Sequence, residues 1–388
     1  MEQIQLSNGH VYLLVDTSVQ GGMIWTANKH PELNATDLFY ASLFMGLGGV
    51  LALLFTLYPV VIILSDKQLK QVFCYFLISS CTANSSIVLI MMFYCIPSVV
   101  YKIYDDTMDG SMFQHWFKAG MGGLFLYVYY VSLLSHFLMS FNRLYAIVWH
   151  LQYAHTFKKN NVFKMIAGSW IVAIPFFLLV ATPISSCTYI YHEEYTIFTY
   201  GLDYCSTWLE RWDAVFSLSI VLVTVCFDLI VAIGLLQRKR KSKQTRTVEA
   251  EMSFFLQTLL TGFVYLCSTL LYHFAGHTFT SEEMWRVFFF DQFPKLCAIL
   301  LIGIFCVTLQ KRIREKFKEH FLIFCCLVLK DKDVEEFEFV LSRLETTVTV
   351  SQVESIQPTV DSNNPLFRKV SKTASSVIER SETTKKER

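Results

Sequence analysis

Charged residues are scarce in this sequence. Asp, Glu, Lys and Arg together make up 17% of the 388 positions, whereas hydrophobic residues make up 53% and aromatic residues 15%. Soluble domains normally carry about 25% charged residues, and a core of ordinary size does not need so many apolar ones. The composition therefore argues against a chain of two or three soluble domains and favours a membrane protein.

Several motifs that carry chemistry are also missing. The sequence has no His and Glu residues at zinc-ligand spacing and no glycine-rich phosphate loop. It lacks the inverted repeat or the pair of broken apolar segments that mark the midplane substrate site of many transporters. The net charge of +1 indicates nothing about partners, because the charges are segregated along the chain. We therefore expect no catalytic residues, no metal or cofactor, and no nucleic acid partner.

The N-terminal segment, residues 1–37, lacks the basic start and apolar stretch of a cleavable signal peptide. It carries Asn34-Ala35-Thr36, an acceptor for N-glycosylation if this end of the chain lies outside the cytoplasm. The same pattern begins at Asn84 inside an apolar run, where no glycosyltransferase would reach it. Asn34 is therefore the candidate glycosylation site.

Seven apolar runs follow, each of about 20 residues or more, which is the length that a helix needs to cross a bilayer. Because the hydrocarbon offers no water to backbone groups, each run must be a helix. We expect an all-α membrane protein whose seven-transmembrane helix bundle covers residues 38–309. The runs are Leu38–Leu64, Val72–Val100, Trp116–Val148, Val162–Ile184, Trp212–Leu236, Met252–Phe274 and Met284–Leu309.

Loop charges predict the orientation of this bundle. Basic residues gather after the first, third, fifth and seventh runs, most densely in Arg238–Arg246 after the fifth. The opposite loops hold acidic residues instead, such as Asp105 and Glu193. By the positive-inside rule, the N-terminus lies outside the cell and the C-terminal tail lies in the cytoplasm.

The third run ends in a recognisable signature. Arg143 lies where a membrane helix meets water, and a lone Arg there is usually an interfacial anchor. Here, however, it is followed at fixed offsets by Ala146, Ile147, Leu151 and Tyr153. This segment resembles the Asp-Arg-Tyr-x-Ala-Ile-x-x-Pro-Leu-x-Tyr sequence of rhodopsin-like receptors. The Asp, Tyr and Pro of that sequence are replaced by Asn142, Leu144 and His150.

Three charged residues lie well inside the apolar runs, away from their ends. Asp228 is in the fifth run, and Asp291 and Lys295 are in the outer half of the seventh, at i and i+4. Because a charge at mid-membrane costs about 2.5–3.5 kcal/mol on insertion scales, such residues normally face the bundle interior. Asp291 and Lys295 either form an ion pair within their helix or line a ligand pocket that opens to the outside. Both interpretations remain open at this point.

The segment after the seventh run predicts a helix that lies on the membrane. From Gln310 to Phe324, apolar residues recur at helical spacing with basic residues between them, which is typical of an amphipathic interfacial helix. Cys325 and Cys326 follow directly and are candidate palmitoylation sites. We assign residues 310–326 to this eighth helix with its cysteine pair. Residues 327–388 are Ser/Thr-rich and read as a mostly disordered cytoplasmic tail.

These features together resemble the rhodopsin-like G-protein-coupled receptors, and more narrowly the nematode serpentine chemoreceptors of class X. The resemblance covers the chain from about Leu38 to Phe324. The residues that carry the narrower likeness are Ser135-His136-Phe137, Asn142-Arg143, Cys187, Cys205, Asp228 and the stretch Glu251–Thr258.

The resemblance implies a receptor of the plasma membrane, compatible with a sensory cilium. A small-molecule or peptide ligand would enter an outer vestibule, and a heterotrimeric G protein would dock on the inner ends of helices three, five and six. Arrestin and receptor kinases would act at the tail. The candidate ligand-pocket residues are Tyr127, Tyr130, Tyr272, Asp291 and Lys295. The candidate coupling residues are Asn142, Arg143, Leu144, Ile147, Leu151, Arg238, Lys239 and Arg240.

The sequence departs from the wider receptor group in several places. No cysteine lies near Lys118, where most of these receptors form a disulfide to the second outer loop. The resemblance implies instead that Cys187 and Cys205 pair within that loop. Asn84 stands near the usual sodium-binding acid, and the hinge motifs of helices six and seven are absent. Because Asn142 cannot form the resting ion pair that an acid would make with Arg143, we expect raised basal activity.

Two other classes of function are alternatives to the receptor. Lys295 lies close to the depth at which opsins carry retinal, so a retinal-binding light sensor is one alternative. Its counterion would be Asp291, which lies on the same helix. A polytopic transporter is the other alternative.

Overall fold

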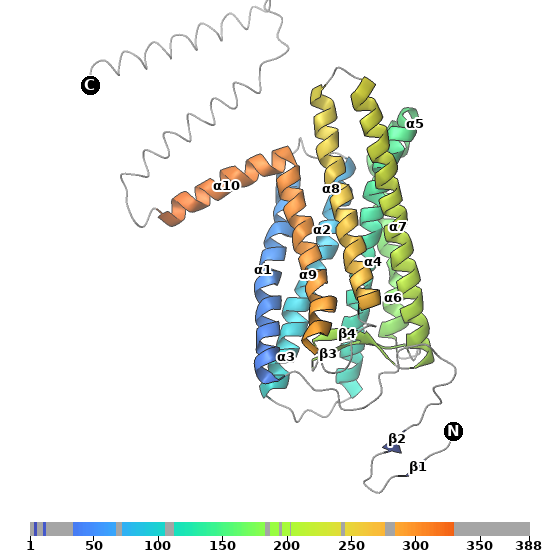
Figure 1. Ribbon diagram of the computed structural model, residues 1–388, viewed down its shortest axis with the longest axis vertical. Helices are drawn as coiled ribbons and strands as arrows, with labels where there is room; N and C mark the ends of the chain where they lie inside the picture. The colour runs from blue at the N-terminus through green and yellow to red at the C-terminus, as the bar shows by residue number, and fades with distance from the viewer. Residues whose placement is uncertain are drawn as a thin grey trace, which may run out of the picture. The chain divides into compact units, whose positions relative to one another are not determined.

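The computed structural model of this chain describes residues 4–5, 11–12, 34–66, 72–104, 112–182, 187–193, 196–201, 203–241, 245–275 and 284–329. Its main part is a bundle of long helices (Figure 1). Within these described residues, seven helical segments are long and apolar enough to cross a membrane. Each falls on one of the seven runs expected from the sequence, so the prediction of a seven-helix membrane fold is confirmed.

The spans are formed by α1 (Ala35–Ser65), α2 (Val72–Ile90) with the π-helical turn η2 (Met91–Cys95) and α3 (Ile96–Tyr104), α4 (Met112–Val148), α6 (Lys159–Ala181), α7 (Tyr204–Lys241), α8 (Thr245–Leu270) with the π-helical turn η3 (Leu271–Ala275), and α9 (Met284–Leu309). The other helices are α5 (His150–Thr156) and α10 (Lys311–Leu329). Two antiparallel strand pairs complete the described elements, β1 (Ile4–Gln5) with β2 (Val11–Tyr12) and β3 (Tyr189–His192) with β4 (Ile197–Tyr200).

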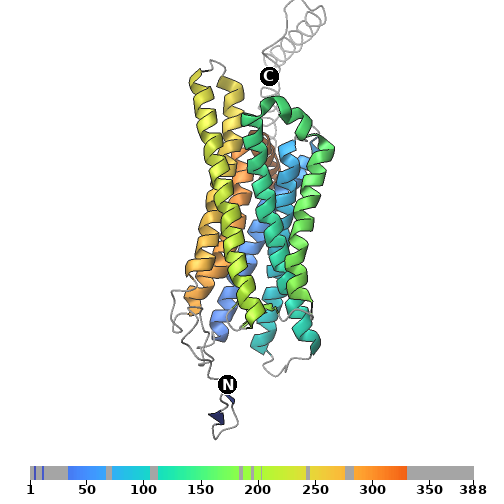
Figure 2. The same cartoon turned by 90° about the vertical axis from the view of Figure 1, so that its right-hand side faces the viewer.

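The central helix of the bundle is α4, which packs against α2, α6, α7 and α8. Figure 2 shows these helices running nearly parallel. Among its apolar residues, the buried face of α4 includes the polar residues Ser132, His136 and Ser140. Apolar residues such as Leu54 of α1 and Ile171 of α6 are exposed on the outside of the bundle. This distribution suits a bundle in lipid, where the helix exterior need not be polar and interhelical hydrogen bonds hold the interior together.

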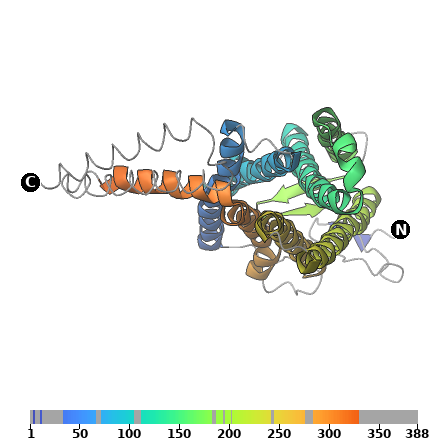
Figure 3. The same cartoon turned by 90° about the horizontal axis from the view of Figure 1, so that it is seen from above.

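The two ends of the bundle differ in their covering elements. Figure 1 shows the β3–β4 hairpin at one end and α5 at the other, and these are named here the hairpin end and the α5 end. The hairpin lies within the ring of helices when the bundle is seen along its length (Figure 3). Its side chains Tyr189, Tyr191 and Phe198 are buried. The hairpin therefore fills space at an end where the sequence had suggested a vestibule.

The fifth span begins earlier than the sequence suggested. The apolar run was expected to start at Trp212, but α7 begins at Tyr204. The reason is a helix cap, because a carboxylate oxygen of Asp203 accepts a hydrogen bond from the backbone N–H of Ser206 at 2.8 Å. The added turns carry polar residues, which hydropathy alone assigns to a loop. Cys205 therefore lies in the first turn of α7 rather than in a loop.

The helix after the seventh span is present but longer than expected. The chain divides into two compact units, Met1–Phe317 and Lys318–Arg388, and α10 begins in the first of them. There Phe317 lies against the rings of Phe55 and Tyr58 of α1, at centroid distances of 6.1 and 5.1 Å. The helix with its cysteine pair was expected to end at residue 326, but it continues to Leu329. No Gly or Pro occurs there to stop it. The side chains of both cysteines and the tail from residue 330 lie outside the described residues.

Candidate functional site

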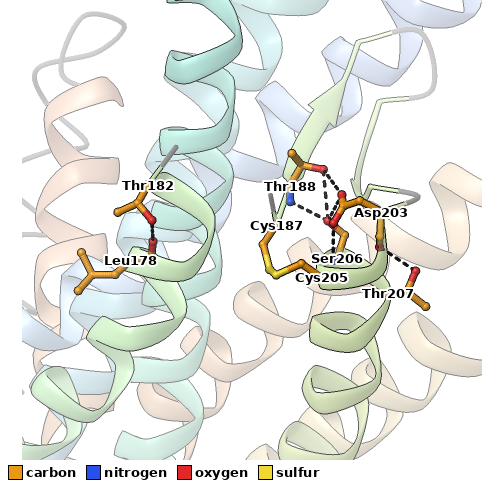
Figure 4. The surroundings of a disulfide bond; sticks show 8 residues. All are labelled: Leu178, Thr182, Cys187, Thr188, Asp203, Cys205, Ser206 and Thr207. Atoms are coloured by element: carbon orange, nitrogen blue, oxygen red, sulfur yellow. Dashed lines mark hydrogen bonds between the residues drawn. A yellow bond between two sulfur atoms is a disulfide. The ribbon is translucent and has the colours of Figure 1, made fainter. Parts of the chain in front are cut away.

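The hairpin is fixed to the start of α7. Cys187, two residues before β3, forms a disulfide with Cys205, and their Cα atoms lie 4.8 Å apart (Figure 4). This is the pairing that the sequence led us to expect. The backbone N–H of Thr188 donates a hydrogen bond to the Ser206 hydroxyl at 2.7 Å, and that hydroxyl donates to Asp203 at 2.6 Å. The residue that caps α7 therefore also anchors the hairpin.

A second contact joins the hairpin to α4. Lys118 Nζ lies 2.7 Å from a carboxylate oxygen of Glu193, which directly follows β3. One turn further along α4, a Cβ atom on Gly122 would overlap the carbonyl oxygen of Tyr189, so only glycine fits there. An ion pair and a close backbone approach therefore link the hairpin to α4. They lie in the region near Lys118, which has no cysteine to form the disulfide that most rhodopsin-like receptors have there.

The hairpin end contains a buried acidic residue that the sequence analysis missed. Asp213 of α7 accepts hydrogen bonds from the hydroxyls of Tyr130 on α4 and Tyr200 on β4, the latter at 2.9 Å. His273 Nε2 lies 3.9 Å from the same carboxylate and 3.0 Å from the Ser217 hydroxyl. Asp213 is the second residue of the expected fifth run, which starts at Trp212. Because α7 begins at Tyr204, Asp213 lies more than two turns into the helix.

Tyr200 keeps its proton in this arrangement. Burial raises the pKa of its phenol well above the usual value, and the negative charge of Asp213 raises it further. The hydroxyl therefore remains a donor to Asp213 at physiological pH.

A cationic residue lies beside this acidic group. Lys295 Nζ of α9 is 3.8 Å from the ring centroid of Tyr272, and the Tyr272 hydroxyl is 3.4 Å from that of Tyr189. The ring of Tyr189 lies 4.5 Å from that of Tyr200, which connects the two halves of the group. We name these residues the hairpin-end cluster: Tyr130, Tyr189, Tyr200, Asp213, Tyr272, His273 and Lys295.

The π-helical turn η3 explains how two adjacent residues join this cluster. In a regular helix, neighbouring side chains diverge by about 100°. Tyr272 and His273 both lie in η3, and each contacts a member of the cluster. Such π-turns occur often at functional sites. The sequence has no local signal for one here, since no Gly or Pro lies in Leu271–Ala275.

The structure brings together three of the five candidate pocket residues, namely Tyr130, Tyr272 and Lys295. Tyr127 points elsewhere, because its ring lies 5.9 Å from that of Trp170 on α6. The side chain of Asp291 lies outside the described residues, so both interpretations, the ion pair with Lys295 and a place in the ligand pocket, stay predictions.

A smaller polar group connects three helices at mid-bundle. Ser132 of α4 donates a hydrogen bond to Asn84 of α2 at 2.6 Å and lies 2.5 Å from the Tyr265 hydroxyl of α8. Asn84, which stands near the usual sodium-binding acid, thus joins helices through its amide. The Tyr265 ring lies 5.2 Å from the ring of His136.

At the α5 end, the signature residues have separate environments. Asn142 is buried, and its side-chain oxygen accepts a hydrogen bond from the Tyr153 hydroxyl of α5 at 3.1 Å. Burial raises the pKa of that phenol, while the charge of Arg143 and the bond to Asn142 partly offset the rise. The Arg143 guanidinium lies 4.2 Å from the ring centroid of Phe73 on α2.

The other candidate coupling residues divide into buried and exposed sets. Leu144 is buried in a cluster with Val231 and Leu235 of α7, and Ile147 packs against that cluster. Leu151 of α5 is 85% exposed. Arg238, Lys239 and Arg240 belong to the end of α7, but the structure does not describe their side chains.

Comparison with known proteins identifies similar chains. A family model described as "Serpentine type 7TM GPCR chemoreceptor Srx" matches residues 45–309. The chain is also 25% identical over 180 residues to Serpentine receptor class X-43 of Caenorhabditis elegans. That alignment covers 44% of this chain and 55% of the relative, so the chain spans about half the length of this curated protein.

Proposed function

The chain belongs to the Srx family of serpentine seven-transmembrane chemoreceptors, and from that premise we propose that it binds a ligand at the hairpin end and activates a heterotrimeric G protein at the α5 end. It is a multi-pass membrane protein and a receptor of the chemosensory type. Membership of this family favours a receptor over the light sensor and the transporter.

The hairpin end is the extracellular end in this proposal. The Cys187–Cys205 disulfide lies there, and disulfides persist in oxidising compartments outside the cytoplasm. The basic stretch that starts at Arg238 begins in the last turn of α7, at the opposite end of that helix, and the positive-inside rule assigns such a stretch to the cytoplasm. Asn34, exposed just before α1, is then available for glycosylation. We place the receptor in the plasma membrane and, as an expectation from its class, in a sensory cilium.

The observation that carries the ligand proposal is the hairpin-end cluster. It combines a buried acid, Asp213, with a buried cation, Lys295, and with several tyrosine hydroxyls from α4, β4 and η3. Buried charges in a membrane bundle mark functional sites by default. A small molecule or peptide that exchanges hydrogen bonds with this cluster would favour one helix arrangement over another. It can shift the equilibrium only by its difference in affinity for the two.

The G protein contacts the α5 end through the exposed and half-buried signature residues. Leu151 offers an exposed apolar side chain, and Arg143 a guanidinium at the inner end of α4. Arg238, Lys239 and Arg240 add positive charge at the end of α7. We assign Leu144 and Asn142 supporting roles, because Leu144 packs against α7 and Asn142 holds α5 through Tyr153. Arrestin and receptor kinases at the tail, and palmitoylation of Cys325 and Cys326, complete the proposal.

Replacement of Asp213 tests the ligand site. Cells that express the chain would be exposed to fractionated extracts until one evokes G-protein activation. Asp213→Asn should abolish or right-shift the response by at least tenfold at matched surface level, because a charge-assisted bond contributes about 1.5–3 kcal/mol. Tyr127→Phe is the matched control, since Tyr127 faces α6. An unchanged response in Asp213→Asn would exclude the cluster as the ligand site.

A further inference from the structure

A second buried acid lies nearer the α5 end. Asp228 of α7 is fully buried, and neither of its carboxylate oxygens has a hydrogen-bond partner among the described residues. Both ring nitrogens of His136 and the hydroxyl of Ser140, on α4, are also buried without a partner there. Buried polar groups in native proteins are nearly always satisfied, so a cluster of three such residues calls for an explanation.

These groups converge beside a glycine of α8. A Cβ atom built on Gly262 would lie 3.2 Å from an oxygen of Asp228 and 3.3 Å from Nε2 of His136. The absent side chain of Gly262 therefore leaves a polar gap between the carboxyl and the imidazole. One water molecule could reach both groups, with the Ser140 hydroxyl as a third partner.

No described donor lies at hydrogen-bonding geometry to the Asp228 carboxyl, although the hydroxyls of Ser140 and Thr258 are close to it. From α4, His136 and Arg143 are the titratable groups that face Asp228. The charge of Arg143 acts on the carboxyl from a distance. From α8, Thr258 and Gly262 face it, but the Thr258 hydroxyl donates to the carbonyl of Phe255 at 2.9 Å. Tyr265 of α8 lies against the ring of His136. On α7 itself, Cys226 is exposed on the outside.

A buried carboxylate anion without donors is costly. Isolated ions in a low-dielectric interior take up or release a proton rather than remain charged and unpaired. Asp228 therefore holds a proton as a neutral acid in this arrangement, and His136 is a neutral imidazole. The neutral acid can donate to water in the gap, and the water can donate to the imidazole.

Arg143 lies on the same face of α4 as this pair. His136, Ser140 and Arg143 are spaced at i, i+4 and i+7, which places them in one row along the helix. Position 142 carries Asn rather than an acid. The carboxyl that the signature lacks at that position is thus present on α7, one helix away.

We propose that Asp228 and His136 form a proton-binding site, occupied in the arrangement described and emptied when Arg143 moves to pair with Asp228. In this step the O–H bond of the Asp228 acid breaks, its electron pair stays on the carboxylate, and the proton leaves through water to the cytoplasm. The guanidinium neutralises the new negative charge, and nothing is oxidised or reduced. The ligand of this site is a proton, and the proposal rests on the coupling role given to Arg143.

The sign of the pH effect follows from linkage. The arrangement described here, in which Asp228 holds its proton, binds one proton more than the arrangement in which Arg143 and Asp228 pair. Lowering the cytoplasmic pH therefore favours the protonated arrangement, by up to tenfold in the equilibrium constant for each pH unit. Basal G-protein activation should rise with cytoplasmic pH.

Infrared spectroscopy of the purified receptor in vesicles tests the site without any G protein. The wild type should show a protonated-carboxyl stretch that shifts in Asp228→Glu and disappears in Asp228→Asn. Spectra that neither substitution alters would overturn the proposal. Gly262→Ala should also perturb the band, because its methyl group enters the gap. Gly168→Ala is its control, since a Cβ there meets no atom within 4 Å.

The pH dependence of nucleotide exchange is the second arm of the experiment. Membranes would be assayed with purified G proteins from about pH 6 to about pH 8, a range that spans ordinary histidine titration. We expect exchange to rise with pH in the wild type and to lose that slope in Asp228→Asn. A flat wild-type profile would overturn the proton site. If Arg143→Ala activates the G protein as well as the wild type, the coupling role proposed for Arg143 is wrong. The infrared band would then still decide whether Asp228 holds a proton.

Discussion

The side-chain oxygen of Asn142 accepts a hydrogen bond from the Tyr153 hydroxyl at 3.1 Å. Asn142, which precedes Arg143, therefore uses its side-chain oxygen to bind the short helix α5. Tyr153 in turn stacks on Phe157, with the ring centroids 5.1 Å apart. Through this contact, the end of α4 and the turn of chain that follows it hold each other in place.

Tyr153→Phe should weaken this end of the bundle. The substitution removes one partly buried hydrogen bond and leaves the Asn142 oxygen without its donor, which costs about 1 kcal/mol. We expect a lower midpoint of thermal unfolding in detergent and a smaller maximal G-protein response. Tyr204→Phe is the control, because Tyr204 is 84% exposed. Equal loss in both variants would show that the contact has no special role.

Asn142→Asp should lower basal signalling. A carboxylate at this position can still accept the Tyr153 hydrogen bond and adds a negative charge beside Arg143, which favours the resting arrangement. The measurement is ligand-free G-protein activation at matched surface expression. Basal signalling that stays the same or increases would contradict this expectation.

Much of the fold could be predicted from sequence because lipid imposes simple rules. Every span must be a helix of sufficient length, so hydropathy located all seven. The start of α7 was not predicted, although Asp203 is a common helix-capping residue. The turns that follow it are polar, so hydropathy assigns them to a loop.

The candidate site was only partly predictable. Tyr272 and Lys295 could be found because each stands out in an apolar run. Asp213 and Tyr200 could not, since their proximity depends on how the hairpin folds back into the bundle. The inward direction of both Tyr272 and His273 depends on a π-helical turn, which has no composition of its own.

The Lys118–Glu193 ion pair should stabilise the hairpin modestly. Exposed pairs contribute about 0.2–1 kcal/mol, and Lys118 is 36% exposed. We expect Lys118→Glu to loosen the hairpin, seen as faster protease cleavage of the loop at the hairpin end. The double variant Lys118→Glu with Glu193→Lys should recover protection. Failure of the second change to restore it would mean that the pair does not hold the hairpin.

Tyr200 should make stability depend on alkaline pH. Because the folded protein raises the pKa of its phenol, it binds that proton more tightly than the unfolded chain does. This contribution is complete below the ordinary tyrosine value of about 10 and is lost as the pH rises above it. The midpoint temperature of thermal unfolding in detergent should therefore fall more steeply above about pH 10 in the wild type than in Tyr200→Phe. Parallel profiles would contradict the assignment.

Ligand-free and extract-stimulated G-protein activation by Arg143→Ala shows whether the G protein couples to the α5 end. The wild type, Arg143→Ala and the control Arg211→Ala, an exposed arginine at the hairpin end, would be compared at equal surface level. Our account predicts that Arg143→Ala abolishes the signal while Arg211→Ala retains it. Equal activation by all three chains would contradict the account, because the α5 end would then not be the coupling surface.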